Sequence, residues 1–328
     1  MKKTLLILAA CLMGINAHAE VIWVGNGDSV NWFDTNKDDK NNNDELTGDG
    51  RYCWAATAAN IISWWQSQPQ NAYAVQDSSA PQGQQSIWDT FRDTFINDSG
   101  HEASAFNWYF NGDNLGYPSP KPNATNTAGN FYQGVEFDFY DCQVIDPRRF
   151  EGSGWIFEDN DYAFRKEAKD ADKDMYLTFS SKLKGYLENG YAIGIAVGAG
   201  YQHAITLWGA EFDNQSGYIT SVWVTDSDDA SASSVDELGM FELKCTPGVV
   251  EYGNEYIFMG SVDLFMVTST EEAEDGAHWY DASRMDNIYE FTAFKAVPKN
   301  LAPTVPEPAT GTLSLLALAG LCARRRRK

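Results

Sequence analysis

The fold is decided by residues 203–226, which read HAITLWGAEFDNQSGYITSVWVTD. Two runs rich in β-branched and aromatic residues, 203–212 and 218–225, flank the turn-forming stretch at 213–217, which has the length of a hairpin connection. Further strand patterns occur at residues 192–197, 239–243 and 256–267. We therefore expect an antiparallel sheet in this part of the chain.

Helical patterns come earlier in the sequence. Residues 53–66 are rich in alanine and carry an apolar face, and Pro69 ends that helix. Residues 172–189 show apolar side chains at helical spacing, and one more helix is expected at about 86–96. Helices followed by an antiparallel sheet predict the α+β class.

Composition limits the kind of protein. The chain has 328 residues, of which 43 % are hydrophobic and 14 % aromatic, so it is not a disordered chain. Its net charge of −22 argues against nucleic acid as a partner, because phosphate binding needs a basic surface. Five cysteines without a C-x-x-C pair give neither a disulfide scaffold nor a zinc ribbon. With no internal repeat, residues 20–296 are expected to form one domain.

The N-terminus has the features of an export signal. Residues 1–19 begin with two lysines, continue through an apolar stretch and end in Ala17-His18-Ala19, which predicts cleavage before Glu20. A lipoprotein box ending at Cys11 is the alternative, but the apolar stretch before it is short, so plain cleavage is favoured. We expect the mature protein outside the cytoplasm.

The C-terminus resembles the bacterial PEP-CTERM sorting tail. A proline-rich linker at 297–310 contains Pro306-Glu307-Pro308, and the segment at 311–328 joins a short apolar run to a terminal arginine cluster. The apolar run is shorter than the roughly 20 residues of a stable transmembrane helix, and the arginines would hold its end on the cytoplasmic side. A short ordinary membrane anchor is the alternative. From the sorting tail we expect transient membrane association and a location in the cell envelope or outside the cell.

Thiol and imidazole groups are few in residues 20–296. The cysteines there are Cys53, Cys142 and Cys245, an odd number for an oxidising compartment. The simplest arrangement joins Cys142 to Cys245 and leaves Cys53 free, although the sequence does not fix that pairing. The histidines are His101, His203 and His278.

Cys53, His203 and Asp226 occur in the order of a thiol protease. The N–H groups at a helix start favour a thiolate at Cys53, and a nearby imidazolium favours it further. A hairpin would bring Asp226 beside His203, where its carboxylate could fix the imidazole in one tautomer. The alternative is structural, since free cysteines are commonly core residues and lone histidines are commonly satisfied structural groups.

Three separated motifs resemble the immunoglobulin-degrading cysteine peptidase (IdeS/Mac) family of papain-like fold. They are DTNK at 34–37, CWAATAAN at 53–60 with Trp64-Trp65 after it, and HAITLWGAEFD at 203–213 followed by VTDSD at 224–228. The resemblance implies a nucleophile helix packed on an antiparallel sheet that carries the histidine and the aspartate.

The resemblance also assigns roles. It implies Cys53 as nucleophile, His203 as general base and acid, Asp226 as the group that orients His203, and Asp228 as a second acidic site residue. Lys37 matches the family lysine that helps the Cys53 N–H bind the oxyanion. No cofactor or metal is implied. The partner would be a protein or peptide substrate, with immunoglobulin-like proteins as one class, but cleavage of immunoglobulin itself does not follow because specificity depends on extended surfaces.

Two departures from the family pattern leave a second function open. The stretch between Lys37 and Cys53 is longer, which affects the reach of Lys37, and Trp54 stands where the best-known member has glycine, which would narrow the substrate cleft or change its shape. The alternative is a catalytically inactive, surface-displayed binding module on the same fold. Acyl transfer to an amine is a third possibility with the same triad.

The stretch after residue 34 has an alternative reading as a calcium loop. Oxygen donors occupy positions 1, 3, 5, 9 and 12 of the calcium-loop template, namely Asp34, Asn36, Asp38, Asn42 and Glu45. However, Asp39 stands where the template needs glycine and no flanking helices are evident. A solvated acidic insertion is favoured.

Overall fold

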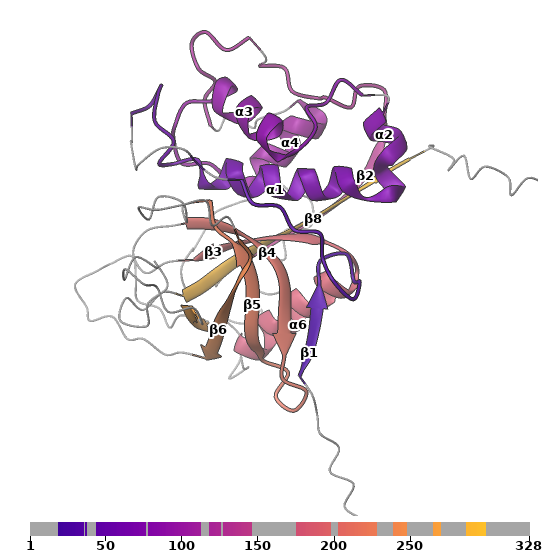
Figure 1. Ribbon diagram of the computed structural model, residues 1–328, viewed down its shortest axis with the longest axis vertical. Helices are drawn as coiled ribbons and strands as arrows, with labels where there is room; N and C mark the ends of the chain where they lie inside the picture. The colour runs from indigo at the N-terminus through magenta and orange to yellow at the C-terminus, as the bar shows by residue number, and fades with distance from the viewer. Residues whose placement is uncertain are drawn as a thin grey trace, which may run out of the picture.

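The computed structural model describes residues 19–35, 37, 44–76, 78–112, 118–125, 127–145, 175–197, 203–227, 239–247, 265–269 and 287–299. The described chain has a helical part and a sheet part, and helix α1 (Cys53–Ser67) lies between them (Figure 1). The α+β class predicted from the sequence is confirmed.

The helical part is built around α1. It also contains the 3₁₀ turn η1 (Pro69–Asn71) and helices α2 (Ala72–Gln76), α3 (Gln84–Thr94) and α4 (Glu102–Asn111). Helices α3 and α4 pack on one side of α1 and strands of the sheet on the other, so α1 is buried from Trp54 to Trp65. The alanines of α1 suit this position, because small side chains let neighbouring elements approach from both sides.

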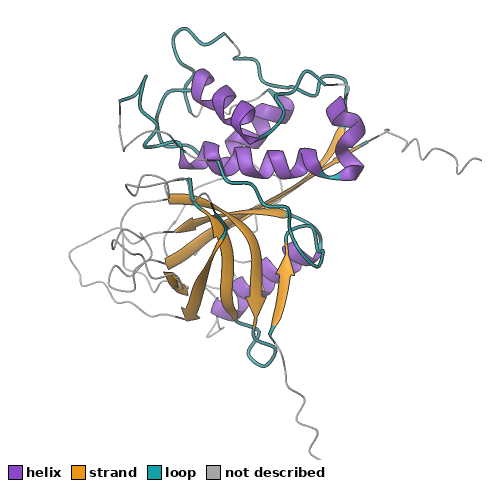
Figure 2. Cartoon of the chain, viewed as in Figure 1, coloured by secondary structure: helices purple, strands orange, loops and turns teal. Residues whose placement is uncertain are grey.

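The strand pairings of the described sheet are antiparallel. The strands are β1 (Glu20–Trp23), β2 (Phe137–Ile145), β3 (Ala192–Val197), β4 (His203–Phe212), β5 (Ile219–Thr225), β6 (Phe241–Pro247), β7 (Phe265–Ser269) and β8 (Asn287–Pro298). The order is β1-β4-β3-β8-β7-β6-β5, and β5 also pairs with β4, so the path closes on itself. Strand β2 pairs with β8 alone among the described strands. The result is a barrel-like sheet below the helices (Figure 2).

The sheet is covered on both faces. Gly194 of β3 lies against Thr57 of α1, and its partner on β8 is Thr292. Phe291 is one residue away and therefore points to the opposite face, where it packs on Phe179 and Tyr186 of α6 (Met175–Glu188). The order of layers is thus helices, sheet, helix.

The β4–β5 hairpin places the site. Its turn is held by the Asp213 carboxylate, which accepts hydrogen bonds from the backbone N–H groups of Gln215 (3.1 Å) and Ser216 (2.6 Å). The hairpin pairs Thr206 with Thr225. Consequently His203 at the start of β4 and Asp226 just after β5 lie at the same end of the sheet.

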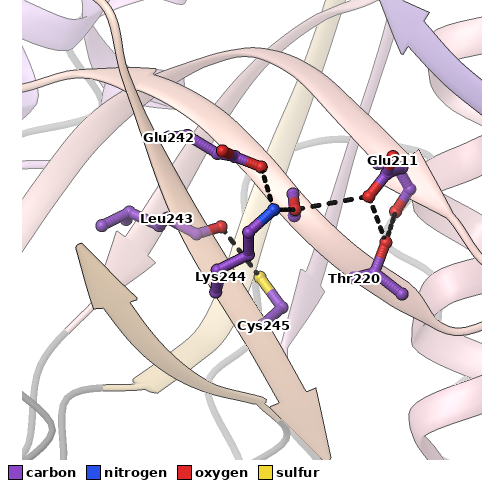
Figure 3. Close-up of polar contacts among 7 residues, drawn as sticks. Glu211, Thr220, Glu242, Leu243, Lys244 and Cys245 are labelled. Carbon is purple, nitrogen blue, oxygen red and sulfur yellow. Dashed lines mark hydrogen bonds and ion pairs between the residues drawn. The ribbon is translucent and has the colours of Figure 1, made fainter. Parts of the chain in front are cut away.

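The expected Cys142–Cys245 disulfide is wrong. Cys245 is a free, buried thiol that points at the Leu243 carbonyl oxygen, 3.8 Å from it (Figure 3). Burial raises the pKa of that thiol far above its usual range. Cys142 belongs to β2, which pairs with β8, whereas Cys245 belongs to β6, whose partners are β5 and β7. The two residues thus lie on strands that do not neighbour each other.

Candidate functional site

Cys53 is the first residue of α1 and is partly exposed. The preceding residue, Tyr52, is fully buried, and its carbonyl oxygen accepts the N–H groups of Ala55 (2.9 Å) and Ala56 (3.0 Å). The Tyr52 hydroxyl also donates to the Phe95 carbonyl oxygen. The first turn of α1 contains no acidic residue, so no carboxylate offsets the positive end of the helix dipole at Cys53.

His203 is held by a carboxylate on the neighbouring strand. Its Nε2 lies 2.7 Å from Oδ1 of Asp226, and both side chains are buried, at 8 % and 2 % exposure. With Nε2 on Asp226, Nδ1 is the ring nitrogen left to exchange a proton with Cys53. The His203 side chain hydrogen-bonds the Cys53 thiol, so the ring bridges thiol and carboxylate.

The charges of this group favour a thiolate and an imidazolium. Burial raises the pKa of Cys53, but the His203 hydrogen bond and charge, the charge of Lys37 and a backbone hydrogen bond from Ala204 outweigh it and leave the pKa below its usual value. Burial lowers the pKa of His203, but the charge and hydrogen bond of Asp226, together with Cys53, raise it well above its usual value. The two shifts have opposite signs, which widens the pH range in which Cys53 is anionic while His203 is cationic.

Lys37 lies close enough to Cys53 for its charge to act on the thiol. It is 3 % exposed, and its backbone N–H donates to the Ser227 carbonyl oxygen (3.1 Å). Two residues earlier, Thr35 donates its N–H (2.8 Å) and hydroxyl (2.7 Å) to Oδ1 of Asn60 on α1. The longer stretch that follows Lys37 therefore does not carry its side chain away from Cys53.

Asn60 and Thr225 join this segment to the sheet. The Asn60 amide donates to the Thr206 hydroxyl (3.0 Å), and the Thr225 hydroxyl donates to the Phe33 carbonyl oxygen (3.0 Å). The roles of Asn60 and Thr225 were not predicted from the sequence, although both belong to motifs that carry the family resemblance. The available signal was Asn60 itself, a polar residue within the largely apolar helix predicted at 53–66, because a buried polar side chain needs a hydrogen-bond partner.

Asp34 is buried, at 2 % exposure, and is not part of a solvated acidic insertion as expected. Its Oδ2 accepts the N–H of Gly239 at 2.9 Å. Of the other residues of the calcium-loop template, Glu45 is exposed, and Asn36, Asp38 and Asn42 lie outside the described residues. Over the described part of the chain, no three His, Cys, Asp or Glu side chains are grouped to hold a metal ion.

Trp54 does not narrow a cleft beside Cys53, contrary to the expectation. Its side chain is 1 % exposed, and its indole N–H donates to the Asp98 carbonyl oxygen (3.1 Å). The indole packs against Phe91 and Phe95 and lies directly against Gly100. A tryptophan at this position fills the helical part of the molecule.

The remaining candidate residues are placed as follows. His101 caps α4, with Nδ1 accepting the N–H of Ala103 (3.3 Å) and Nε2 lying 2.9 Å from Oε1 of Glu290, so it has structural partners. Asp228 and His278 lie outside the described residues.

Comparison with known families agrees with the resemblance. Residues 154–255 match the family model described as Mac 1, and residues 304–328 match the PEP-CTERM protein-sorting motif. The Mac 1 match covers His203 and Asp226, whereas Cys53 and Lys37 lie before it. No curated protein matches the chain significantly. The sorting motif supports export and sorting to the envelope, and no helix within the described ranges is long and apolar enough to cross a membrane.

Proposed function

We propose that the chain is an exported cysteine endopeptidase that hydrolyses peptide bonds of protein substrates through Cys53, His203 and Asp226. One observation carries the proposal: the His203 ring bridges the thiol at the start of α1 and the carboxylate after β5. A structural cysteine needs neither a buried imidazole nor a lowered pKa. The match to the Mac 1 model supports a peptidase-like family. The position of α1 between a helical part and a closed antiparallel sheet supports a papain-like fold.

Acylation follows from the charges at the site. The Cys53 thiolate attacks the peptide carbonyl carbon, and the carbonyl oxygen becomes an oxyanion. The His203 imidazolium then gives its proton to the leaving amine nitrogen, so the C–N bond breaks and a thioester remains on Cys53. Asp226 fixes the orientation of the imidazole ring, so that Nδ1 stays directed at the reacting atoms during this transfer.

Deacylation uses the same imidazole. Neutral His203 accepts a proton from a water molecule as the water oxygen attacks the thioester carbon. Collapse of the second tetrahedral intermediate releases the carboxylic acid product and restores the thiolate–imidazolium pair. The proton taken from water stays on His203, so atoms and charges balance over the cycle.

The oxyanion has two candidate donors. The first N–H groups of a helix lack partners within the helix, which leaves the Cys53 N–H available to the oxyanion. Lys37 is the second, because its charge already acts on the thiol. Asp228, as a second acidic site residue, remains part of the proposal from the resemblance alone.

The alternative of an inactive binding module was based on Trp54 and on the longer stretch after Lys37, and the structure removes both reasons. Trp54 packs inside the helical part, and Lys37 is buried within electrostatic reach of Cys53. Neither departure from the family pattern therefore argues against the proposed peptidase. We further propose that a signal peptide at 1–19 is removed and that the 311–328 tail gives transient membrane association.

The test is cleavage of a casein and immunoglobulin panel by the parent, Cys53→Ala and His203→Ala. Cys245→Ala is the matched control, since it removes the other free thiol among the described residues. The proposal expects cleavage by the parent and by Cys245→Ala, and no cleavage by Cys53→Ala or His203→Ala. The circular dichroism spectra of all three variants should match that of the parent. Cleavage by Cys53→Ala at the parent rate would overturn it.

A further inference from the structure

We propose that Asp34 is a positioning residue: its bonds to Gly239 before β6 and to Gln84 on α3 fix the segment at 34–37 and so hold Lys37 near Cys53. This inference rests on the proposed function only in taking Cys53 as the reactive group. Asp34 touches no reacting atom in the proposed mechanism. It acts through Lys37, three residues along the chain.

The segment at 34–37 holds both ends of the connection that follows Asp226. At the first end, the Ser227 carbonyl oxygen accepts the Lys37 N–H at 3.1 Å. At the second end, the Gly239 N–H donates to Oδ2 of Asp34 at 2.9 Å. The two bonds tie residues 227 and 239, just before β6, to the same short segment. The Asp34 carboxyl is the only side chain in this pair of ties.

Asp34 is also fixed from the helical side. Its N–H donates to Oε1 of Gln84 (3.2 Å), and its carbonyl oxygen accepts from Nε2 of Gln84 (2.7 Å). Gln84 is the first residue of α3. The Asp34 main chain is thus anchored to the helices while its side chain reaches the sheet, so it joins the two parts at the level of the site.

Burying the Asp34 carboxyl costs free energy of folding, which is consistent with a role at the site. Its Oδ1 is buried with no hydrogen-bond partner among the described residues, and such a group normally costs stability. The charged group that acts on it is Asp226, at the end of β5. The contacts from Gln84 on α3 and from Gly239 before β6 are neutral. Burial, with a smaller contribution from Asp226, raises the pKa of Asp34 to about 7, so below pH 7 most of the carboxyl is neutral beside the triad aspartate.

A neutral carboxyl explains how the tie works. Oδ2 accepts the Gly239 N–H whether or not the group is ionised, whereas ionisation places a second negative charge near Asp226. An asparagine reproduces the neutral form, because its amide oxygen accepts the same bond. Alanine removes the acceptor and leaves the Gly239 N–H without it.

The experiment measures the second-order rate constant for alkylation of Cys53 by iodoacetamide between pH 5 and 8, with the site read by peptide mass spectrometry. The variants are Asp34→Ala, Asp34→Asn, Lys37→Met and the double variant that combines Asp34→Ala with Lys37→Met. If Asp34 holds Lys37 near the thiol, Asp34→Ala should raise the pKa of Cys53 and slow alkylation by about 3–10-fold at pH values below that pKa, where the rate follows the thiolate fraction. Asp34→Asn should restore the rate to within about twofold.

The double variant separates positioning from general loosening. Residues acting through one another give non-additive effects, so the double variant should react no more slowly than Lys37→Met alone. Independent, multiplying effects, or an Asp34→Ala rate equal to the parent rate, would overturn the proposal. If Asp34→Ala does not fold, Gln84→Ala loosens the same segment from the other side, and it should slow alkylation in the same direction. A parent-like rate for a folded Gln84→Ala would then count against the tie.

The outcome is independent of peptidase activity. If the parent cleaves no protein but the alkylation pattern holds, the proposed function fails and the role of Asp34 stands. If the parent cleaves its substrate and Asp34→Ala alkylates like the parent, the role of Asp34 fails and the proposed function stands.

Discussion

Asp226→Asn tests the charge balance of the site most informatively. The asparagine keeps nearly the same shape but removes the charge that, with its hydrogen bond, raises the pKa of His203. A hydrogen bond to a charged group contributes about 1.5–3 kcal/mol, and about 1.36 kcal/mol corresponds to one pKa unit. Removing the charge from the 2.7 Å contact should therefore lower the pKa of His203.

The sign of the pH effect follows from the direction of the shift. A group with a raised pKa in the folded state contributes stability below its unfolded pKa and loses it as the pH rises through the folded value. For His203 that loss lies well above neutral pH in the parent. In Asp226→Asn it should move down toward neutral pH, and the thiolate–imidazolium pair should break up earlier.

The assay is NMR titration of ¹³C-labelled histidine, which is practical because the chain has four histidines. Peptide hydrolysis is measured in parallel, and kcat/KM should fall about 10–100-fold at neutral pH, as expected for the loss of about 1.4–2.7 kcal/mol. Asp93→Asn is the matched control, because the Asp93 side chain is 75 % exposed on α3. If His203 titrated identically in the parent and Asp226→Asn, the proposed role of Asp226 would be refuted.

Three other predictions follow from the same geometry. Lys37→Met should raise the pKa of Cys53 and lower kcat/KM by about 100–1000-fold, the range for loss of one oxyanion donor; an unchanged pH–rate profile would show that Lys37 plays no part. Trp54→Ala should lower the free energy of unfolding by about 3–5 kcal/mol, as for other buried aromatic residues; urea titration checks this, and unchanged stability with broader peptide specificity would instead place Trp54 in the cleft. Asp34→Asn should be more stable than the parent above pH 7 by about 2–4 kcal/mol, because a carboxyl whose pKa is raised stabilises the fold below its unfolded pKa and loses that contribution as pH rises through about 7. If the free energies of unfolding of the two proteins, measured by urea denaturation, differed by the same amount at every pH from 5 to 9, this would be contradicted.

Local patterns predicted the elements that carry the site. The helix expected at 53–66 is α1, the one expected at 86–96 is α3 shifted two residues earlier, and the one expected at 172–189 is α6. Strands β3, β4 and β5 and the hairpin turn also appear where alternation and turn residues indicated. Each of these segments has a strong local signal of its own.

Elements defined by distant partners were not predicted. Strand β8 pairs with β2, β3 and β7, and β1 pairs with β4, so each depends on neighbours that a local pattern does not reveal. Helix α4 lies in a region rich in Asn, Gly, Ser and Pro, and its cap is the unusual residue His101. The strand expected at 239–243 begins β6, which continues to Pro247, and of the one expected at 256–267 only the end falls within described residues, where β7 begins.

The site was only partly visible in the sequence for the same reason. Cys53, His203 and Asp226 are separated along the chain, yet residue type and order suggested them. The buried state of Asp34, the wrong disulfide and the inward packing of Trp54 depend on which elements cover each residue. The spacing of residues along the chain does not reveal which helices and strands pack over each of them.

Selective alkylation at pH 7 tests the central claim most directly. The native full chain is exposed briefly to iodoacetamide and the cysteine peptides are then mapped by mass spectrometry. A thiolate held by His203 should make Cys53 react while Cys245, buried with a raised pKa, stays unmodified until the protein is denatured. A Cys53 that reacts only after denaturation, together with Cys245, would contradict the account.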